Sequence, residues 1–364
     1  MEGKGALEKK AVIAMSGGVD SSVAAYLTLQ DGYSCIGATM QLFRNEDICV
    51  ERTRTCCSLD DVQDARRVAN AMGMRHYVFN FTEEFGKLVM QRFVTEYEAG
   101  RTPNPCIDCN RFLKFERLLE RARQLEHEVV VTGHYARIEK DTGGRYLLRQ
   151  AVDEKKDQSY VLYAMTQDQL AHTLLPLGGM TKDEARAIAA KQGFSTAQKR
   201  DSQDICFVPD GDYAAFIEKH AGKKSLPGCF VDGRGNILGQ HRGCTHYTIG
   251  QRRGIGLSFE KPMYVCDINT QKNEVLLGEN AQLFKKVLYA KEINWVACET
   301  LETPRRVRAK IRYRQPAQWA RAEQTGPDEI RVEFEEPQRA IAPGQAVVLY
   351  EGDVVLGGGT IQKT

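Results

Sequence analysis

The sequence predicts an α/β fold in its first half, then a small helical or mixed central domain and a C-terminal β-barrel domain. Strand-like apolar runs alternate with amphipathic helical stretches up to about residue 132, and from about residue 228 glycines are frequent and short β-rich runs recur. Repeated strand–helix units favour a parallel sheet covered by helices. Short strands separated by glycine-rich turns are typical of small barrels.

The elements are expected in the following order. Apolar runs predict N-terminal strands over residues 11–15, 33–42, 77–81 and 128–132. Helical periodicity predicts helices over 19–29, 58–72, 85–97 and 112–125, and then over 167–175 and 181–192. Thr181 and Glu184 are spaced as a capping box for the last helix. Later strands are expected over 263–268, 274–277, 307–313, 330–334 and 346–350.

These elements suggest domains over residues 1–165, 166–227 and 228–364. A composition of 42% hydrophobic and 27% charged residues is typical of globular proteins. We find no apolar run long enough to cross a membrane, and residues 1–10 lack the apolar core of a signal peptide. We therefore expect a cytoplasmic protein. The 11 cysteines are an odd number, which argues against a disulfide framework in a reducing compartment.

A glycine-rich turn, Ala-Met-Ser-Gly-Gly-Val-Asp-Ser-Ser at residues 14–22, joins the first strand to the first helix. Backbone N–H groups in such a turn can close around phosphate oxygens, and Gly17 and Gly18 permit the tight geometry. Serine hydroxyls add donors, and Asp20 is expected to cap the helix or to help hold a metal. No Gly-Lys-Ser/Thr follows, so this is not a Walker loop.

The segment Thr-Pro-Asn-Pro-Cys-Ile-Asp-Cys-Asn at residues 102–110 places Cys109 at the expected start of the helix over 112–125. A helix N-terminus and nearby cations favour a thiolate, so Cys109 is a candidate nucleophile. Cys106 and Cys109 also form a C-x-x-C pair, which suits a redox dithiol or half of a metal site. Another cysteine, Cys206, follows in a polar loop, and Cys56 and Cys57 adjoin a predicted helix.

Cationic side chains gather in the predicted C-terminal barrel, which suggests a nucleic-acid partner although the net charge is only +2. No acidic residue interrupts this basic stretch, which contains Arg305, Arg306, Arg308, Lys310, Arg312, Arg314 and Arg321. The alternative is a solvated strand face.

The Ser-Gly-Gly-Val-Asp-Ser turn resembles the PP-loop of ATP pyrophosphatases, which cleave ATP between the α and β phosphates and adenylate a substrate. Together with later motifs, the chain resembles the tRNA-specific 2-thiouridylase family over nearly its whole length. The matching motifs are residues 16–22, 102–110, 132–135, 156–160, 201–207, 246–252, 312–314 and 343–345. This resemblance implies a Rossmann-like parallel sheet and an enzyme that places sulfur on the wobble uridine of lysine, glutamate and glutamine tRNAs.

The resemblance also implies a role for each matching residue. Cys109 would be the nucleophile and Cys206 would carry a persulfide. The residues that would bind ATP are Ala14, Met15, Ser16, Gly17, Gly18, Val19, Asp20, Ser21, Met40 and Gly133. The target base would meet Asn104, Pro105 and Cys106. The residues that would contact tRNA are His134, Lys156, Asp157, Gln158, Arg312, Tyr313 and Gln345.

The implied cofactors are ATP and Mg²⁺, and the implied partners are tRNA and a cysteine desulfurase or sulfur-relay protein. One departure matters, because many family members carry Asp where this chain has Cys106. Three thiols could therefore converge, and an iron–sulfur cluster held by Cys106, Cys109 and Cys206, with sulfide as donor, remains an alternative. Two further alternatives are a different adenylating PP-loop enzyme and a non-catalytic tRNA-binding or sulfur-carrier protein.

Overall fold

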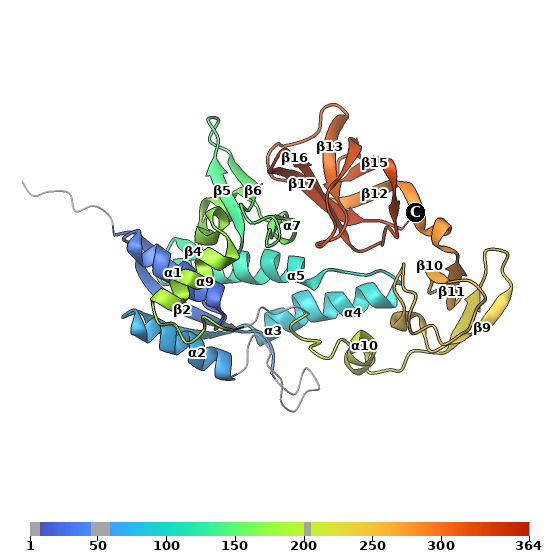
Figure 1. Cartoon of the computed structure of the whole chain (residues 1–364), viewed down its shortest axis with the longest axis horizontal. Coiled ribbons are helices and arrows are strands. Elements are labelled where there is room, and N and C mark those ends of the chain that lie inside the picture. Colours follow the sequence, from blue (N-terminus) through green and yellow to red (C-terminus); the bar gives the residue numbers. More distant parts are fainter. Residues whose placement is uncertain (1–7, 45–58, 200–204, 364) are drawn as a thin grey trace, which may run out of the picture. The chain divides into compact units, whose positions relative to one another are not determined.

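The structure, a computed structural model, describes residues 8–44, 59–199 and 205–363 (Figure 1). Cys56 and Cys57 lie outside the described residues. Contacts divide the chain into two compact units. The first unit contains residues 1–88, 106–209 and 353–355, and the second contains residues 89–105, 210–352 and 356–364.

The first unit is built on a five-stranded parallel sheet in the order β3-β2-β1-β4-β7. Its strands are β1 (Lys10–Ala14), β2 (Ser34–Gln41), β3 (Arg75–Asn80), β4 (Val129–Val131) and β7 (Thr173–Leu174). The predicted Rossmann-like sheet is confirmed. The central strand β1 is apolar because helices cover both faces of a parallel sheet, and Ala11, Val12 and Ile13 are fully buried.

Helices α1 (Val19–Gln30), α2 (Leu59–Ala71) and α9 (Lys182–Lys191) contribute to one core with this sheet. Thr181 caps α9, and its reciprocal capping box with Glu184 is confirmed. The shorter helices of the unit are α3 (Thr82–Phe85), α7 (Ser159–Leu162), α8 (Gln167–Ala171) and the 3₁₀ turn η3 (Pro176–Gly179). A hairpin of β5 (Ala136–Lys140) and β6 (Tyr146–Gln150) follows β4 and was not predicted.

Strand order reverses beside β1, since β2 lies on one side of it and β4 on the other. In open parallel sheets, ligands bind beyond the carboxyl ends of the strands at such a reversal. The turn after β1 is the glycine-rich Ser16–Gly18, and the turn after β4 contains Gly133. The topology therefore brings these two motifs to one edge of the sheet.

Three helix predictions need correction. The helix expected over 112–125 begins at Pro105 and runs as α5 (Pro105–Asp108), the π-helical η2 (Cys109–Arg117) and α6 (Leu118–Gln124). A proline fits the first helical position, because its missing N–H would have no intrahelical partner there. The helix expected over 167–175 ends at Ala171, and Thr173–Leu174 joins the sheet as β7.

The predicted helix over 85–97 is also interrupted, by the π-helical segment η1 (Gly86–Met90), and it resumes as α4 (Gln91–Glu98). In the second unit, Phe93 of α4 packs against Tyr213 and Phe216 of α10 (Tyr213–Ala221), with ring centroids 6.1 and 6.0 Å apart. These aromatic contacts bury one face of each helix.

The second unit also contains a four-stranded sheet in the order β10-β11-β8-β9. Its strands are β8 (Gly228–Val231), β9 (Ile237–His241), β10 (Tyr264–Asn269) and β11 (Glu274–Gly278), and the 3₁₀ turns η4 (Cys244–His246) and η5 (Asn280–Leu283) follow β9 and β11. Phe230 and Val265 are fully buried in its core. The strands expected near 263–268 and 274–277 are confirmed, whereas β8 and β9 were missed.

The predicted C-terminal β-barrel is confirmed. Six strands follow the order β12-β15-β14-β13-β16-β17, and β12 also pairs with β17, which closes the sheet on itself. They are β12 (Phe284–Trp295), β13 (Arg305–Lys310), β14 (Gln318–Gly326), β15 (Glu329–Arg339), β16 (Ala346–Glu351) and β17 (Val354–Ile361). Alternation places Val307 and Ala309 inside and Arg306 and Arg308 on the other face.

Candidate active site

The turn between β1 and α1 has the geometry of a phosphate cradle. Gly17 has a φ of +70°, and a Cβ at this position would lie 2.3 Å from the carbonyl oxygen of Asp61, so only glycine fits. Gly18 is the N-cap of α1 and brings no side-chain acceptor, so the first N–H groups of this helix keep their capacity to bind an anion.

Serine side chains hold this turn in place. The Ser21 hydroxyl accepts a hydrogen bond from the Ser16 N–H at 3.2 Å and donates to the Gly18 carbonyl at 3.1 Å. Ser22 donates to the same carbonyl at 2.9 Å and also bonds the Thr196 hydroxyl. The bonds among Ser16, Gly18, Ser21 and Ser22 close the turn on itself, so the backbone is arranged before any ligand arrives.

Asp20 is an ion-pair partner and not a helix cap. Lys182 donates to both of its carboxylate oxygens at 2.8 Å, and the Tyr135 hydroxyl donates to one of them at 2.8 Å. The predicted capping role of Asp20 is therefore wrong, because Gly18 occupies the N-cap position. Buried Lys182, at the start of α9, thus contacts the first turn of α1. The two residues are 162 positions apart, so no local sequence pattern could reveal this pair.

A second lysine, Lys199, contacts the turn directly. Its ammonium donates to the Gly17 carbonyl at 2.9 Å, to Asp64 at 2.8 Å and to Asp61. Burial opposes the charge of Lys199, but the hydrogen bonds to both carboxylates outweigh it and raise the pKa of this lysine. Sequence reasoning missed Lys199, whose two carboxylates come from α2.

The turn after β4 approaches the first turn of α1. A Cβ on Gly133 would lie 2.7 Å from the carbonyl carbon of Asp20, so only a glycine allows this contact. The predicted ATP residues of both turns are therefore brought together. The predicted residue Met40 lies near the carboxyl end of β2, the strand beside β1.

His134, beside Gly133, is buried. Its Nδ1 lies 2.7 Å from the Thr132 hydroxyl, and its ring lies 5.9 Å from that of Phe115 in η2. Burial, reinforced by the positive charge of Lys114, holds the pKa of His134 well below its usual value. The imidazole is therefore neutral at pH 7 and packs between the end of β4 and η2.

The paired cysteines lie on the continuous helix that begins at Pro105. Cys106 is exposed and Cys109 is buried. Cys109 is the fifth residue of this helix and the first of its π-helical part, so it does not stand at the helix start as predicted. π-Helical turns are rare and occur frequently at functional sites.

The neighbouring Asn110 is 2% exposed and donates from its amide to the Val161 carbonyl at 3.1 Å. Its side-chain oxygen has no hydrogen-bond partner among the described residues. An unsatisfied buried acceptor beside a candidate nucleophile is uncommon and marks this turn as specialised.

Cys206 is half-buried, and the next residue anchors it. Phe207 is 1% exposed and packs edge-to-face on Phe85 of α3, with ring centroids 5.6 Å apart. The aromatic contact thus holds the backbone beside Cys206 against α3. Helix α3 in turn contacts η2, which is part of the continuous helix that begins at Pro105 and carries Cys106 and Cys109, which we call the cysteine helix.

The cysteines do not form a metal-binding group as they stand. Across residues 8–44, 59–199 and 205–363, no three His, Cys, Asp or Glu side chains are placed to share a metal ion. Cys106, Cys109 and Cys206 fall within these ranges, so their arrangement does not fit an iron–sulfur cluster. We therefore derive no reaction step through such a cluster.

Family models match almost the whole chain. One described as tRNA methyl transferase HUP domain matches residues 9–210, a tRNA methyl transferase PRC-barrel domain matches residues 214–279, and an aminomethyltransferase beta-barrel domain matches residues 285–361. The tRNA-specific 2-thiouridylase MnmA of Clostridioides difficile is 53% identical over 359 residues, which cover 98% of this chain and 99% of that protein. The chain belongs to the tRNA-specific 2-thiouridylase family.

Two further 2-thiouridylases show the same extent of similarity. The protein of Lachnoclostridium phytofermentans is 52% identical over 98% of this chain and 100% of its own length. That of Symbiobacterium thermophilum is 50% identical over 98% of this chain and 92% of its own length. The family resemblance inferred from the motifs is confirmed. Among the helices of the described residues, none is both long and apolar enough to cross a membrane.

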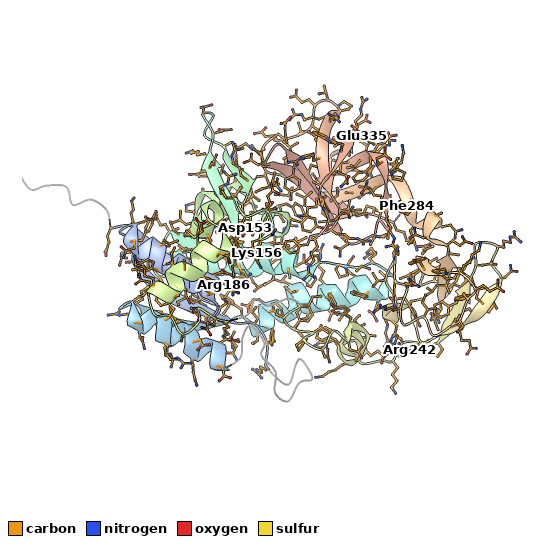
Figure 2. The ribbon with its side chains drawn as sticks, viewed as in Figure 1. Asp153, Lys156, Arg186, Arg242, Phe284 and Glu335 are labelled. Atoms are coloured by element: carbon orange, nitrogen blue, oxygen red, sulfur yellow. The ribbon has the colours of Figure 1, made fainter. Side chains whose placement is uncertain are left out.

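In this thiouridylase, the predicted tRNA residues at 156–158 form a turn that supports the connection between β4 and β5. Buried Asp157 accepts hydrogen bonds from the Ala151 and Ser159 N–H groups. Gln158 accepts from the Tyr135 N–H at 3.0 Å, and its own N–H donates to the Tyr135 carbonyl. Lys156 lies beside Asp153 in this turn (Figure 2).

The predicted tRNA residues of the barrel also have partners within the second unit. Arg312 donates to the Ala340 carbonyl, and Lys310 lies over the Tyr313 ring, 5.7 Å from its centroid. The Gln345 amide donates to the carbonyls of Thr102 and Pro103 at 2.8 and 3.2 Å.

The basic stretch of the barrel is partly neutralised by glutamates from two other strands, β15 and β16. Arg306 donates to Glu335 at 2.8 Å, and Arg305 lies 3.6 Å from Glu351 (Glu335 is labelled in Figure 2). The acid-free sequence run therefore does not produce an acid-free surface. Arg314 and Arg321, from the same stretch, are exposed.

Proposed function

We propose that this chain catalyses the ATP-dependent 2-thiolation of the wobble uridine in tRNAs of the lysine, glutamate and glutamine type. The observation that carries the proposal is the preformed glycine turn at the strand-order reversal, in a chain about half identical to 2-thiouridylases over 98% of its length. That turn suits a nucleotide, and Cys109 and Cys206 supply the thiols that sulfur transfer requires.

ATP is proposed to bind with its phosphates over Ser16–Gly18 and the first turn of α1. A uracil 2-carbonyl is a poor electrophile with a poor leaving group. Attack of its oxygen on the α-phosphate would release pyrophosphate and leave AMP as the leaving group on C2. Mg²⁺ would enter with the triphosphate and neutralise its charge. Asp20, Asp61 and Asp64 are engaged by lysines, so we assign no protein ligand to this ion.

Sulfur is proposed to arrive as a persulfide on Cys206, loaded by a cysteine desulfurase or a sulfur-relay protein. In one route the terminal sulfur attacks C2 and displaces AMP. Cys109 then attacks the inner sulfur, which frees the 2-thiouridine. In the other route Cys109 attacks first and releases sulfide, which displaces AMP from C2. Either route forms a Cys109–Cys206 disulfide, and an external thiol must reduce it before the next turnover.

The target base must leave the anticodon stack and enter a pocket proposed at Asn104, Pro105 and Cys106. Extrusion costs a few kcal/mol, and backbone contacts from the barrel's basic stretch would offset this cost. Seven residues stay proposed tRNA contacts, either directly or through the backbone that they support: His134, Lys156, Asp157, Gln158, Arg312, Tyr313 and Gln345. The domain boundaries predicted at 1–165, 166–227 and 228–364 also stay a proposal. So does the location of the protein in the cytoplasm, where its proposed tRNA substrate is found.

The test combines purified chain, unmodified tRNA, ATP and a cysteine desulfurase with cysteine. We expect 2-thiouridine, AMP and pyrophosphate in equal amounts, with no activity in Cys109→Ser or Cys206→Ser although tRNA still binds. Cys35→Ser is the matched control, because burial raises the pKa of the Cys35 thiol to about 11 and leaves it protonated. Near-normal turnover by either active-site variant would remove its assigned role.

A stoichiometric iron–sulfur cluster in anaerobically purified protein, with thiolation from free sulfide, would replace the persulfide route. Adenylation of another substrate without thiolation would point to a different adenylating enzyme, and tRNA binding without ATP turnover to a binding protein.

A further inference from the structure

A loop of the barrel holds the chain just before the cysteine helix. The carbonyl of Pro343 accepts a hydrogen bond from the Thr102 N–H at 2.8 Å. The Gln345 amide donates to the Thr102 carbonyl at 2.8 Å and to the Pro103 carbonyl at 3.2 Å. We call Pro343, Gly344 and Gln345 the 343–345 clamp. It engages both the donor and the acceptor of Thr102.

The approach between the two segments is close. Gly344 has a φ of +89°, and a Cβ there would lie 3.0 Å from the Arg101 Cβ and from the Thr102 nitrogen. A side chain at Gly344 would therefore be strained by its backbone conformation and would also push the two segments apart.

Both sides of the contact are fixed to rigid elements. The clamp exchanges backbone hydrogen bonds with Ile361 at the end of β17, through the Gly344 N–H and the Gln345 carbonyl, at 2.9 and 2.8 Å. On the other side, Arg101 makes a two-pronged ion pair with Glu96 of α4, at 2.6 and 2.5 Å. Charge-assisted pairs of this kind hold their geometry well.

The held segment leads directly into the proposed base pocket. Asn104 follows Pro103, and the cysteine helix begins at Pro105. Pro103 and Pro105 have no N–H with which to fix this stretch. The Gln345 amide adds two hydrogen bonds to the carbonyls of the two residues that precede Asn104.

We propose that the 343–345 clamp, and Gln345 above all, positions the base-pocket segment and the start of the cysteine helix. Gln345 is then a positioning residue that acts through Thr102 and Pro103. The proposal rests on the proposed function, since it assigns the clamp to the pocket for the target base. It also explains how a barrel residue affects the reaction without touching a reacting atom.

The experiment measures the alkylation rate of Cys109 by iodoacetamide in the full chain, without tRNA or ATP. Gln345→Leu keeps the size of the side chain and removes both hydrogen bonds. We expect Cys109, which is 8% exposed, to react about tenfold faster, a factor that corresponds to about 1.4 kcal/mol and to the loss of two neutral hydrogen bonds. Gly344→Ala is expected to act in the same direction.

The matched control is Gln362→Leu, because the Gln362 side-chain amide donates to the Thr360 carbonyl two residues away and not to the segment before the cysteine helix. Thermal melting confirms that each variant is folded, and hydrogen exchange of residues 102–106 gives a second measure that does not depend on thiolation. The thiolation kcat is expected to fall by a larger factor than the affinity for tRNA.

Unchanged Cys109 alkylation and unchanged hydrogen exchange in both clamp variants would overturn the proposal. A loss of tRNA affinity without either change would assign Gln345 to direct RNA contact instead. Because alkylation and exchange are measured without substrates, failure of the clamp and failure of the proposed function are distinguishable.

Discussion

Removing the Phe207 ring is expected to separate Cys206 from the rest of the proposed site. Phe207 is 1% exposed and Phe85 is fully buried, so Phe207→Ala loses a complete aromatic contact. Replacement of a buried Phe by Ala costs about 3–5 kcal/mol, of which about 0.5–1.5 kcal/mol reflects the ring pair. A loss of 3 kcal/mol in the docking of this loop lowers the docked fraction on the order of a hundredfold.

The assay is single-turnover transfer of sulfur from Cys206, loaded with persulfide beforehand, to tRNA in the presence of ATP. Loading is quantified separately, so a failure to accept sulfur is distinguished from a failure to deliver it. We expect normal loading in Phe207→Ala and a transfer rate reduced on the order of a hundredfold.

Phe43→Ala is the matched control. Phe43 is 4% exposed and packs on the same Phe85 ring, with centroids 5.9 Å apart, but it is far from Cys206 in sequence. Both variants should lose similar stability, and only Phe207→Ala should lose transfer. Equal transfer rates in the two variants would refute the anchoring role and leave Phe207 as a core residue alone.

Three further predictions follow from the site and the barrel. Lys199→Met should raise the KM for ATP about fivefold, as a loss of about 1 kcal/mol would, because Gly17, Asp61 and Asp64 lose their shared cation. Lys191→Met is the control. An equal KM in the two variants would exclude a role of Lys199 at the turn. Because the pKa of His134 is lowered in the folded chain, His134 takes up a proton at a higher pH in the unfolded chain than in the folded one. The free energy of unfolding therefore falls as pH falls below about 6.5. His134→Gln should flatten this loss by up to about 1.4 kcal/mol per pH unit in urea titrations, and an unchanged slope would contradict neutral burial. Arg314→Ala should reduce the salt slope of tRNA binding by about 0.7–0.9. Arg306→Ala should change the slope less, because Arg306 is already paired with Glu335. A larger change in Arg306→Ala than in Arg314→Ala would be evidence against a phosphate contact by Arg314.

The parallel sheet and the phosphate turn could be predicted because their signals are local. Apolar runs marked β1 and β2, and the glycine pair between a strand and a helix indicated the turn before any tertiary contact was known. The capping box at Thr181 was equally local, and the structure contains both of its hydrogen bonds. Family motifs then extended the prediction to sulfur chemistry.

The remaining features depend on long-range contacts or on uncommon helical geometry. Lys182 meets Asp20 across 162 residues and Lys199 meets Asp61 across 138, so neither pair leaves a periodic trace. The glutamate that neutralises Arg306 of β13 comes from β15, which lies on the far side of β14 in the sheet order. The π-helical start at Cys109 also escaped prediction, because periodicity over 112–125 says nothing of a helix that begins earlier at a proline.

The most direct test of the central claim follows labelled sulfur from Cys206 into tRNA. Cys206 is loaded with a persulfide whose outer sulfur is isotope-labelled, and the sulfur donor protein is then removed. The loaded chain is mixed anaerobically with ATP and unmodified tRNA under single-turnover conditions. We expect the label in 2-thiouridine, with equal amounts of AMP and pyrophosphate and a Cys109–Cys206 disulfide afterwards. Label that stays on the protein, while added sulfide and iron support thiolation, would contradict the persulfide account.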